Sequence, residues 1–127
     1  MAEKKFAGIR GPVTSPEVNA DYQAARTFDK VKVGKLGVYY RDGFKIRFMD
    51  YSLLERVFIR IQEVNGRMCC GNTIFAYYRL VFVYEGREIG DAISENEQAM
   101  DEALALIKEL APASVAIGVA DKAEVRA

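Results

Sequence analysis

From about residue 28 onward, apolar and polar residues alternate in short runs, the pattern of strands that bury one face. The strictest run covers residues 45–48, where Ile46 and Phe48 lie on one face and two cations on the other. Turn signals containing glycine separate the runs. They occur at residues 34–37, at Asp42 and Gly43, at Asn65 and Gly66, and at Glu85 and Gly86. The pattern predicts six or seven short antiparallel strands, one of them over residues 28–33.

The run over residues 56–64 predicts a strand with two different faces. Its inward positions are Val57, Ile59 and Ile61, and its outward positions are Arg56, Phe58, Arg60 and Gln62. An exposed aromatic ring beside arginines is typical of a protein interface. We therefore identify Arg56, Phe58 and Arg60 as candidate interface residues.

After residue 93 the apolar period changes from two to 3.6, which predicts one amphipathic helix. The apolar stripe consists of Met100, Ala103, Leu104, Ile107 and Leu110. Ser94 and Glu97 have the spacing of a capping box, and Pro112 ends the helix. Because Leu104 lies in the middle of the stripe, we expect it to insert deepest into the core.

The chain has 127 residues, half of them apolar, which suits one compact domain. Glycines and prolines interrupt every period near its start, so we expect residues 1–27 to be a weakly structured N-terminal arm. Residues 28–118 form the predicted domain, and residues 119–127 form a charged C-terminal tail.

Charge and composition exclude several classes of function. Eighteen basic and eighteen acidic side chains cancel, so we expect no nucleic-acid partner. The chain has no histidine, which excludes sites that depend on imidazole, and we expect no catalytic residue, metal or cofactor. Apolar runs stay far below the roughly 20 residues of a membrane span, and no signal-peptide pattern is seen. These features predict a soluble chain, and the two cysteines, which cannot form a disulfide framework, indicate a reducing cytoplasm.

The two cysteines, Cys69 and Cys70, are adjacent. Neighbouring cysteines rarely form a disulfide, because the ring so formed is strained. Neighbouring strand residues also point in opposite directions, which disfavours shared metal ligation. We expect one cysteine to be buried and the other to face a loop.

The order of elements, strands first and a helix last, resembles the pleckstrin-homology-like (PH-like) fold. Residues 38–48, followed by Tyr51, Ser52, Leu54 and Val57, are similar to bacterial proteins of this fold, whose third strand leads into a Tyr-Ser-x-Ile-x-x-Val segment. Residues 63–71, 85–88 and 110–118 also resemble a small bacterial group of this fold with uncharacterised function. The resemblance implies a mainly β (α+β) fold. We expect a small, strongly bent antiparallel sheet, or partly open barrel, of six to seven strands capped by one C-terminal amphipathic helix.

The same resemblance implies a pattern for binding phosphoinositides, in which a lysine is followed by a basic-x-Arg pair on the next strand. Lys35, Lys45 and Arg47 approximate this pattern and are candidate ligands for an anionic group. The alternative interpretation is a solvated sheet face whose cations discourage edge pairing. The tryptophan that many eukaryotic relatives carry in the final helix is absent.

Three hypotheses of function follow. The first is a non-enzymatic PH-like module that binds a protein partner, or itself as an oligomer, through its sheet. The second is an anionic-ligand or phospholipid-headgroup binder at a membrane surface, acting through Lys35, Lys45 and Arg47. The third, an enzyme that uses Cys70 or a carboxylate, has the least support, because no base accompanies the thiol.

Overall fold

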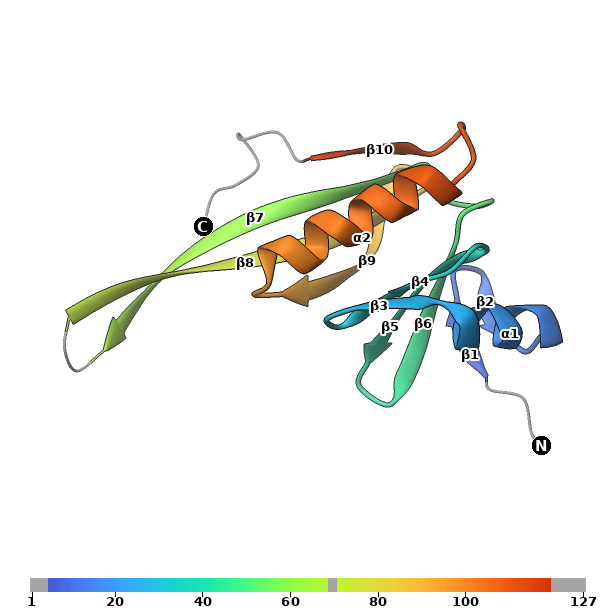
Figure 1. Ribbon diagram of the computed structural model, residues 1–127, viewed down its shortest axis with the longest axis horizontal. Coiled ribbons are helices and arrows are strands. Elements are labelled where there is room, and N and C mark those ends of the chain that lie inside the picture. The colour runs from blue at the N-terminus through green and yellow to red at the C-terminus, as the bar shows by residue number, and fades with distance from the viewer. Residues whose placement is uncertain (1–4, 69–70, 120–127) are drawn as a thin grey trace.

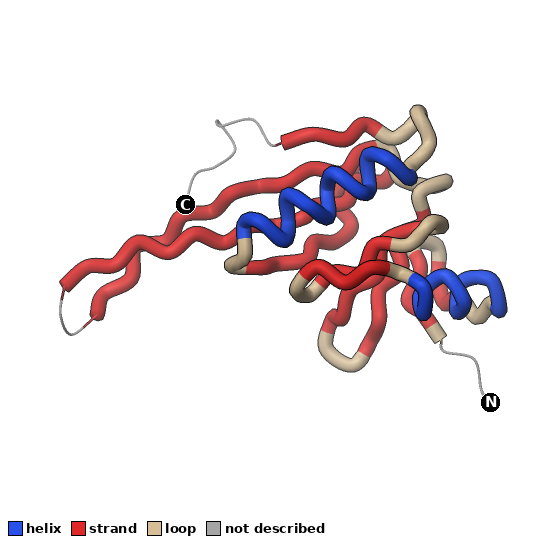
Figure 2. The backbone as a smooth tube through the Cα atoms, viewed as in Figure 1, coloured by secondary structure: helices blue, strands red, loops and turns tan. Residues whose placement is uncertain are grey.

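A computed structural model describes residues 5–68 and 71–119 of the chain. It is mostly β, with two sheets and two helices (Figures 1 and 2). The predicted α+β class, dominated by sheet, is confirmed. The arrangement differs from the predicted single bent sheet with one helix, because the described strands divide into two sheets and form no closed barrel.

The first sheet has six strands in the order β2-β1-β6-β5-β4-β3. They are β1 (Phe6–Gly8), β2 (Gly11–Val13), β3 (Arg26–Phe28), β4 (Val31–Val33), β5 (Gly37–Asp42) and β6 (Lys45–Asp50). All neighbouring pairs are antiparallel except β1 and β6. Helix α1 (Pro16–Ala24) connects β2 to β3.

The second sheet has four strands in the order β10-β7-β8-β9. They are β7 (Arg56–Met68), β8 (Gly71–Tyr84), β9 (Arg87–Ser94) and β10 (Ala116–Val119), and helix α2 (Glu97–Leu110) lies between β9 and β10 in sequence. Strand β10 runs parallel to β7. The prediction that all strands are antiparallel is therefore wrong for β1 and β10, which pair with strands distant in sequence.

The N-terminal segment is not the weakly structured arm that the sequence predicted. It forms β1, β2 and α1, and it contributes Phe6 to a buried aromatic cluster with Tyr39 and Phe48. The hydroxyl of Ser15 accepts a hydrogen bond from the Val18 amide and caps α1. The elements escaped prediction because two of them are only three residues long, too short to show a period.

The carboxylate of Asp21 joins α1 to the six-stranded sheet. It accepts a hydrogen bond from the buried Tyr39 hydroxyl at 2.7 Å. It also accepts the amides of Lys35 (2.7 Å) and Leu36 (3.0 Å) in the turn before β5. Burial, and then the hydrogen bond to Asp21, raise the pKa of Tyr39 well above its usual range.

Most of the predicted turns are confirmed, and one is wrong. The turns at residues 34–37, at Asp42 and Gly43, and at Glu85 and Gly86 separate strands as expected. Asn65 and Gly66 instead stay in the β7 ladder, opposite Ile74 and Thr73. Strand β7 continues to Met68, so the chain reverses later than predicted. Cys69 and Cys70 lie outside the described residues.

A turn that the sequence analysis missed divides residues 28–33. Asp29 has a positive φ of 54° and separates β3 from β4, so the predicted single strand is a short hairpin. Asp tolerates this left-handed conformation better than most residues.

Only residues 120–127 of the predicted tail lie outside the described chain, because Val119 belongs to β10.

The main core lies where α2, the inner face of the four-stranded sheet and strands β3–β6 meet. The predicted helical stripe is confirmed, and Met100, Ala103 and Ile107 have no exposed surface. Leu104 retains 9% of its surface, so the prediction that it inserts deepest is wrong.

In the part of the chain that the structure describes, neither helix is long and apolar enough to span a bilayer.

Helix α2 is capped by Asn96 and not by Ser94. The Asn96 side chain accepts a hydrogen bond from the Ala99 amide at 3.0 Å. Ser94 is buried at the end of β9, where its hydroxyl donates to the Asp29 carboxylate and accepts the Asn96 amide at 3.0 Å. Ser94 therefore connects the two sheets, and α2 ends before Pro112 as predicted.

Candidate functional site: the open face and the arm

The four-stranded sheet has one face without a covering helix, and we call it the open face. Strand alternation places the outward residues of β7 here, as predicted, while Val57 and Ile59 pack into the core. By the ladder registers its residues include Arg56, Phe58, Arg60 and Gln62 from β7, Tyr77, Arg79, Val81 and Val83 from β8, and Glu88, Asp91 and the exposed Ile93 from β9.

Phe58 is not the exposed anchor that the sequence predicted, since only 2% of its surface is accessible. Its ring lies beneath the guanidinium groups of Arg56 and Arg60, whose Cζ atoms are 4.4 and 5.2 Å from the ring centroid. Both distances are within the range of cation–π attraction. Arg56, Phe58 and Arg60 therefore come together, but the arginines present a polar surface and cover the ring.

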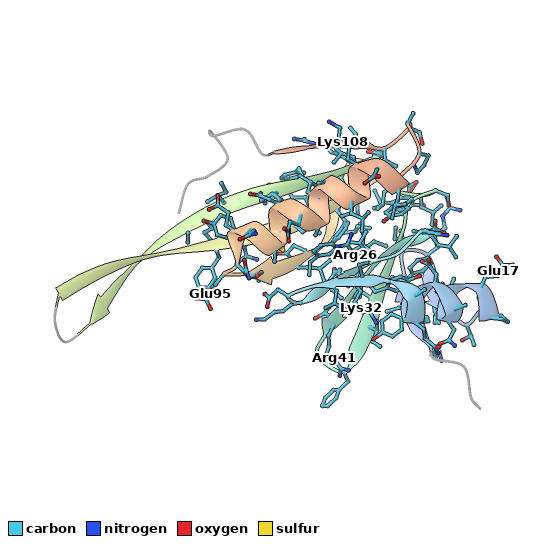
Figure 3. All side chains as sticks on the ribbon, in the orientation of Figure 1. Glu17, Arg26, Lys32, Arg41, Glu95 and Lys108 are labelled. Carbon is cyan, nitrogen blue, oxygen red and sulfur yellow. The ribbon has the colours of Figure 1, made fainter. Side chains whose placement is uncertain are left out.

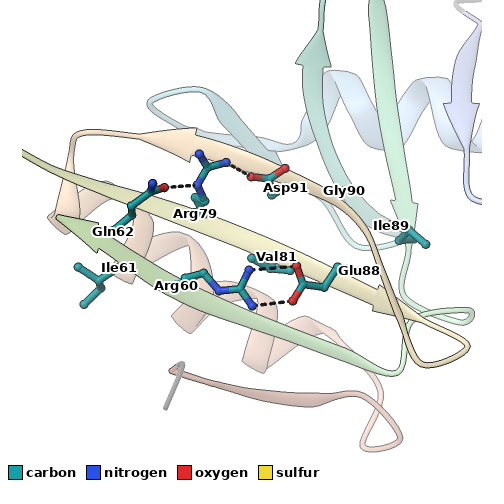
Figure 4. Close-up of a pocket in the computed structure, with 9 residues that line it drawn as sticks. All are labelled: Arg60, Ile61, Gln62, Arg79, Val81, Glu88, Ile89, Gly90 and Asp91. Atoms are coloured by element: carbon teal, nitrogen blue, oxygen red, sulfur yellow. Dashed lines mark hydrogen bonds and ion pairs between the residues drawn. The ribbon is translucent and has the colours of Figure 1, made fainter. Parts of the chain in front are cut away.

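A network of ion pairs crosses the open face (Figure 4). Arg60 donates two hydrogen bonds to the Glu88 carboxylate, at 3.0 and 2.5 Å, and this pair bridges over Val81 from β7 to β9. Arg79 contacts Asp91 at 2.5 Å and the Gln62 amide oxygen at 2.8 Å. The paired charges line a shallow hollow of about 550 Å³.

Arg60 favours the ionised form of Glu88 on the open face. Its hydrogen bonds lower the pKa of Glu88, against a smaller opposing effect of burial, and the charges of Arg60 and Arg56 lower it further. Glu88 therefore stays ionised to lower pH than an isolated glutamate. Two of the arginines of the face, Arg60 and Arg79, are already paired with carboxylates, which suits polar docking better than capture of a free anion.

The three cations predicted to hold an anionic group do not converge. Lys45 and Arg47 lie near the β5–β6 turn, whereas Lys35 precedes Gly37 at the opposite end of the same hairpin. Arg47 is half-buried and donates to the Ile89 carbonyl at 3.0 Å, and it pairs with Asp42 at 3.5 Å. Arg47 therefore connects the two sheets.

Other basic residues of this sheet lie nearer to one another, but carboxylates lie among them. Lys30, Arg41 and Arg47 line one hollow with Asp42 and Asp91, and Lys30, Lys32 and Arg41 line another with Asp29. Figure 3 places Arg26, Lys32 and Arg41 at separate positions on β3–β5. The Lys32 ammonium lies 4.0 Å from the centroid of the Tyr22 ring, which already provides it with a contact. The predicted set Lys35, Lys45 and Arg47 therefore shares no binding geometry, and the cations that do lie together are accompanied by carboxylates.

The β7–β8 hairpin projects beyond the rest of the molecule (Figure 1). Strand β9 pairs with β8 only as far as Tyr78, and β10 pairs with β7 only as far as Ile59. The seven ladder pairs from Gln62↔Tyr77 to Met68↔Gly71 have no strand beside them in the described chain. We call these two segments the arm.

Comparison with known proteins identifies no relative. No family model, no curated protein and no solved structure matches the chain. The site is therefore interpreted from its own geometry.

The sequence analysis missed the arm and the ion-pair network. The arm was missed because the Asn65–Gly66 signal placed the turn too early, which shortened the predicted hairpin. Signals for the network were present, since Arg79, Glu88 and Asp91 are charged residues in the runs on either side of the predicted turn at Glu85 and Gly86. Their mutual contacts required the register between strands, which local patterns do not give.

Proposed function

We propose that the protein is a non-enzymatic, PH-like interaction module that binds a protein partner, or another copy of itself, through its four-stranded sheet. The arm is the contact element. The open face beside it supplies charged side chains, of which Arg60 and Arg79 are paired with Glu88 and Asp91.

The arm is the single observation that carries this proposal. An isolated two-stranded ribbon is only marginally stable in water, and its outer edges expose unpaired N–H and C=O groups. Seven ladder pairs span about 20 Å at roughly 3.4 Å a residue. A ribbon of this length, held out from the core, gains stability when another strand pairs with its edge.

The order of elements supports the PH-like part of the proposal. Strands β3–β6 form one antiparallel meander, β7–β9 form a second, and α2 follows and packs against both sheets. This is the order that the sequence resemblance implies. Strands β1, β2 and β10 and helix α1 are additions to it.

The proposal is tested by affinity purification from cells that express the chain, with bound proteins identified by mass spectrometry. The wild type is compared with Thr73→Lys, which puts a charge on the β8 edge of the arm. The matched control is Thr27→Lys on β3, the edge strand of the other sheet, where Thr27 is already exposed. We expect the same protein, or the chain itself, to be retained by the wild type and the control and lost by Thr73→Lys. Identical bound proteins for all three baits would contradict the proposal.

A further inference from the structure

The two edges of the arm differ in how well they are protected. The β7 edge carries Glu63 and Arg67, and β10 already occupies its beginning up to Ile59. The β8 edge over residues 71–77 has no charged residue and no proline, and it is rich in β-forming residues. Such a segment is a template for strand pairing, and proteins that leave one open normally guard it with charges.

We infer that a second copy of this chain covers the β8 edge. The inference rests on the proposed function and specifies its partner. The two β8 strands pair antiparallel about a two-fold axis, so that each arm completes the other.

The length of the free edge determines the register of this pairing. A two-fold pairing that uses all of residues 71–77 must be centred on the middle residue, Ile74, which then faces its own copy. Gly71 faces Tyr77 of the other copy, and Thr73 faces Phe75. No like charges meet, and a small residue lies opposite a large one at each end.

The end of β9 leaves room for the incoming arm. Strand β9 lies on the same edge of β8 and stops at Ser94, opposite Tyr78, one ladder position before the free edge begins. The second copy's β8 therefore continues the line of β9, starting at the next position. Each arm ends where the other copy's β9 ends, so the two copies share one continuous sheet.

Charge at the two contact points is complementary. Glu95 and Glu97 are exposed directly after β9, and Figure 3 shows Glu95 beside the root of the arm. Arg67 lies opposite Asn72, one ladder pair from the end of the arm. The proposed register places the Arg67 position of one copy on the strand next to the end of the other copy's β9, which leads into Glu95 and Glu97, and symmetry repeats this juxtaposition. Because each chain offers one such edge, the assembly closes at two copies.

The test uses the full chain and two charge variants at the predicted axis. Light scattering after size exclusion is expected to give twice the mass of the chain for the wild type. Ile74→Lys and Ile74→Glu each place like charges opposite one another, so each alone is expected to be monomeric. An equimolar mixture of the two is expected to recover the doubled mass, because lysine then faces glutamate. A variant that had lost its fold would not recover on mixing.

The matched control is Asn65→Lys, which changes the ladder partner of Ile74 on the other edge of the arm. It is expected to keep the doubled mass. A monomeric wild type, charge variants that stay dimeric, or a mixture that stays monomeric would each overturn the inference. If the wild type is monomeric while the affinity experiment still finds an arm-dependent protein, the proposed function stands and only the second-copy assignment fails.

Discussion

Replacing Asp21 by alanine tests whether the N-terminal segment belongs to the folded unit. The substitution removes the acceptor of three hydrogen bonds, one of them from the buried Tyr39 hydroxyl. The Tyr39 hydroxyl then keeps only the Val18 carbonyl, at 3.4 Å, as an acceptor, and a buried donor left poorly satisfied costs about 1–3 kcal/mol. The amides of Lys35 and Leu36 lie in an exposed turn where water can replace the carboxylate, so each contributes less. We expect Asp21→Ala to lower the free energy of unfolding by about 2–4 kcal/mol.

A double-mutant cycle separates the Tyr39 contribution from the rest. Urea denaturation followed by circular dichroism is measured for Asp21→Ala, Tyr39→Phe and the double variant. Because both single changes break the same 2.7 Å hydrogen bond, we expect a coupling energy of about 1–2 kcal/mol. Asp21→Asn, which keeps one acceptor oxygen but loses the charge, is expected to be intermediate. A change within about 0.5 kcal/mol of the wild type for Asp21→Ala would show that α1 lies outside the cooperative unit.

Three further outcomes follow from described contacts. Leu104→Ala should lower the free energy of unfolding by about 2–5 kcal/mol, toward the lower end because the side chain keeps 9% exposure. Ser94→Ala should lower the free energy of unfolding by about 1–3 kcal/mol in the same urea assay. Adding Asp29→Ala to this variant should lower it little further, because the hydrogen bond between the two side chains is already lost. Arg60 lowers the folded-state pKa of Glu88. Ionised Glu88 therefore stabilises the fold at neutral pH, and this stabilisation is lost as the pH falls through the lowered pKa. The urea midpoint of the wild type should therefore fall more steeply on acidification than that of Glu88→Gln, and parallel curves would contradict the assignment.

Local periodicity predicted the elements that bury one continuous face. The α2 stripe and the inward residues Val57 and Ile59 were predictable because burial imposes a period on many consecutive residues. Phe58 was placed on the correct face but was wrongly expected to be exposed. Alternation predicts the face of the sheet on which a residue lies, but not its exposure. Phe58 is covered by two arginines of the same strand, Arg56 and Arg60.

Features that depend on distant pairings could not be predicted in the same way. The parallel contacts of β1 with β6 and of β10 with β7 join segments separated by many residues. The choice of Asn96 over Ser94 as cap was also invisible, because both are good capping residues and a contact to Asp29, 65 residues away, decides between them. The candidate site was therefore only partly predictable, through its residue types and not through their contacts.

The two parallel contacts also affect how the chain reaches this structure. Hairpins β5–β6, β7–β8 and β8–β9 connect neighbours in sequence and can form early. Strand β10 must find Arg56–Ile59 across about 60 residues, which carries a larger loop-closure entropy. We therefore expect the rate-limiting transition state to form before β1 and β10 pair with their neighbouring strands. Substitutions in β10 would mainly accelerate unfolding, and those in the central hairpins would slow folding.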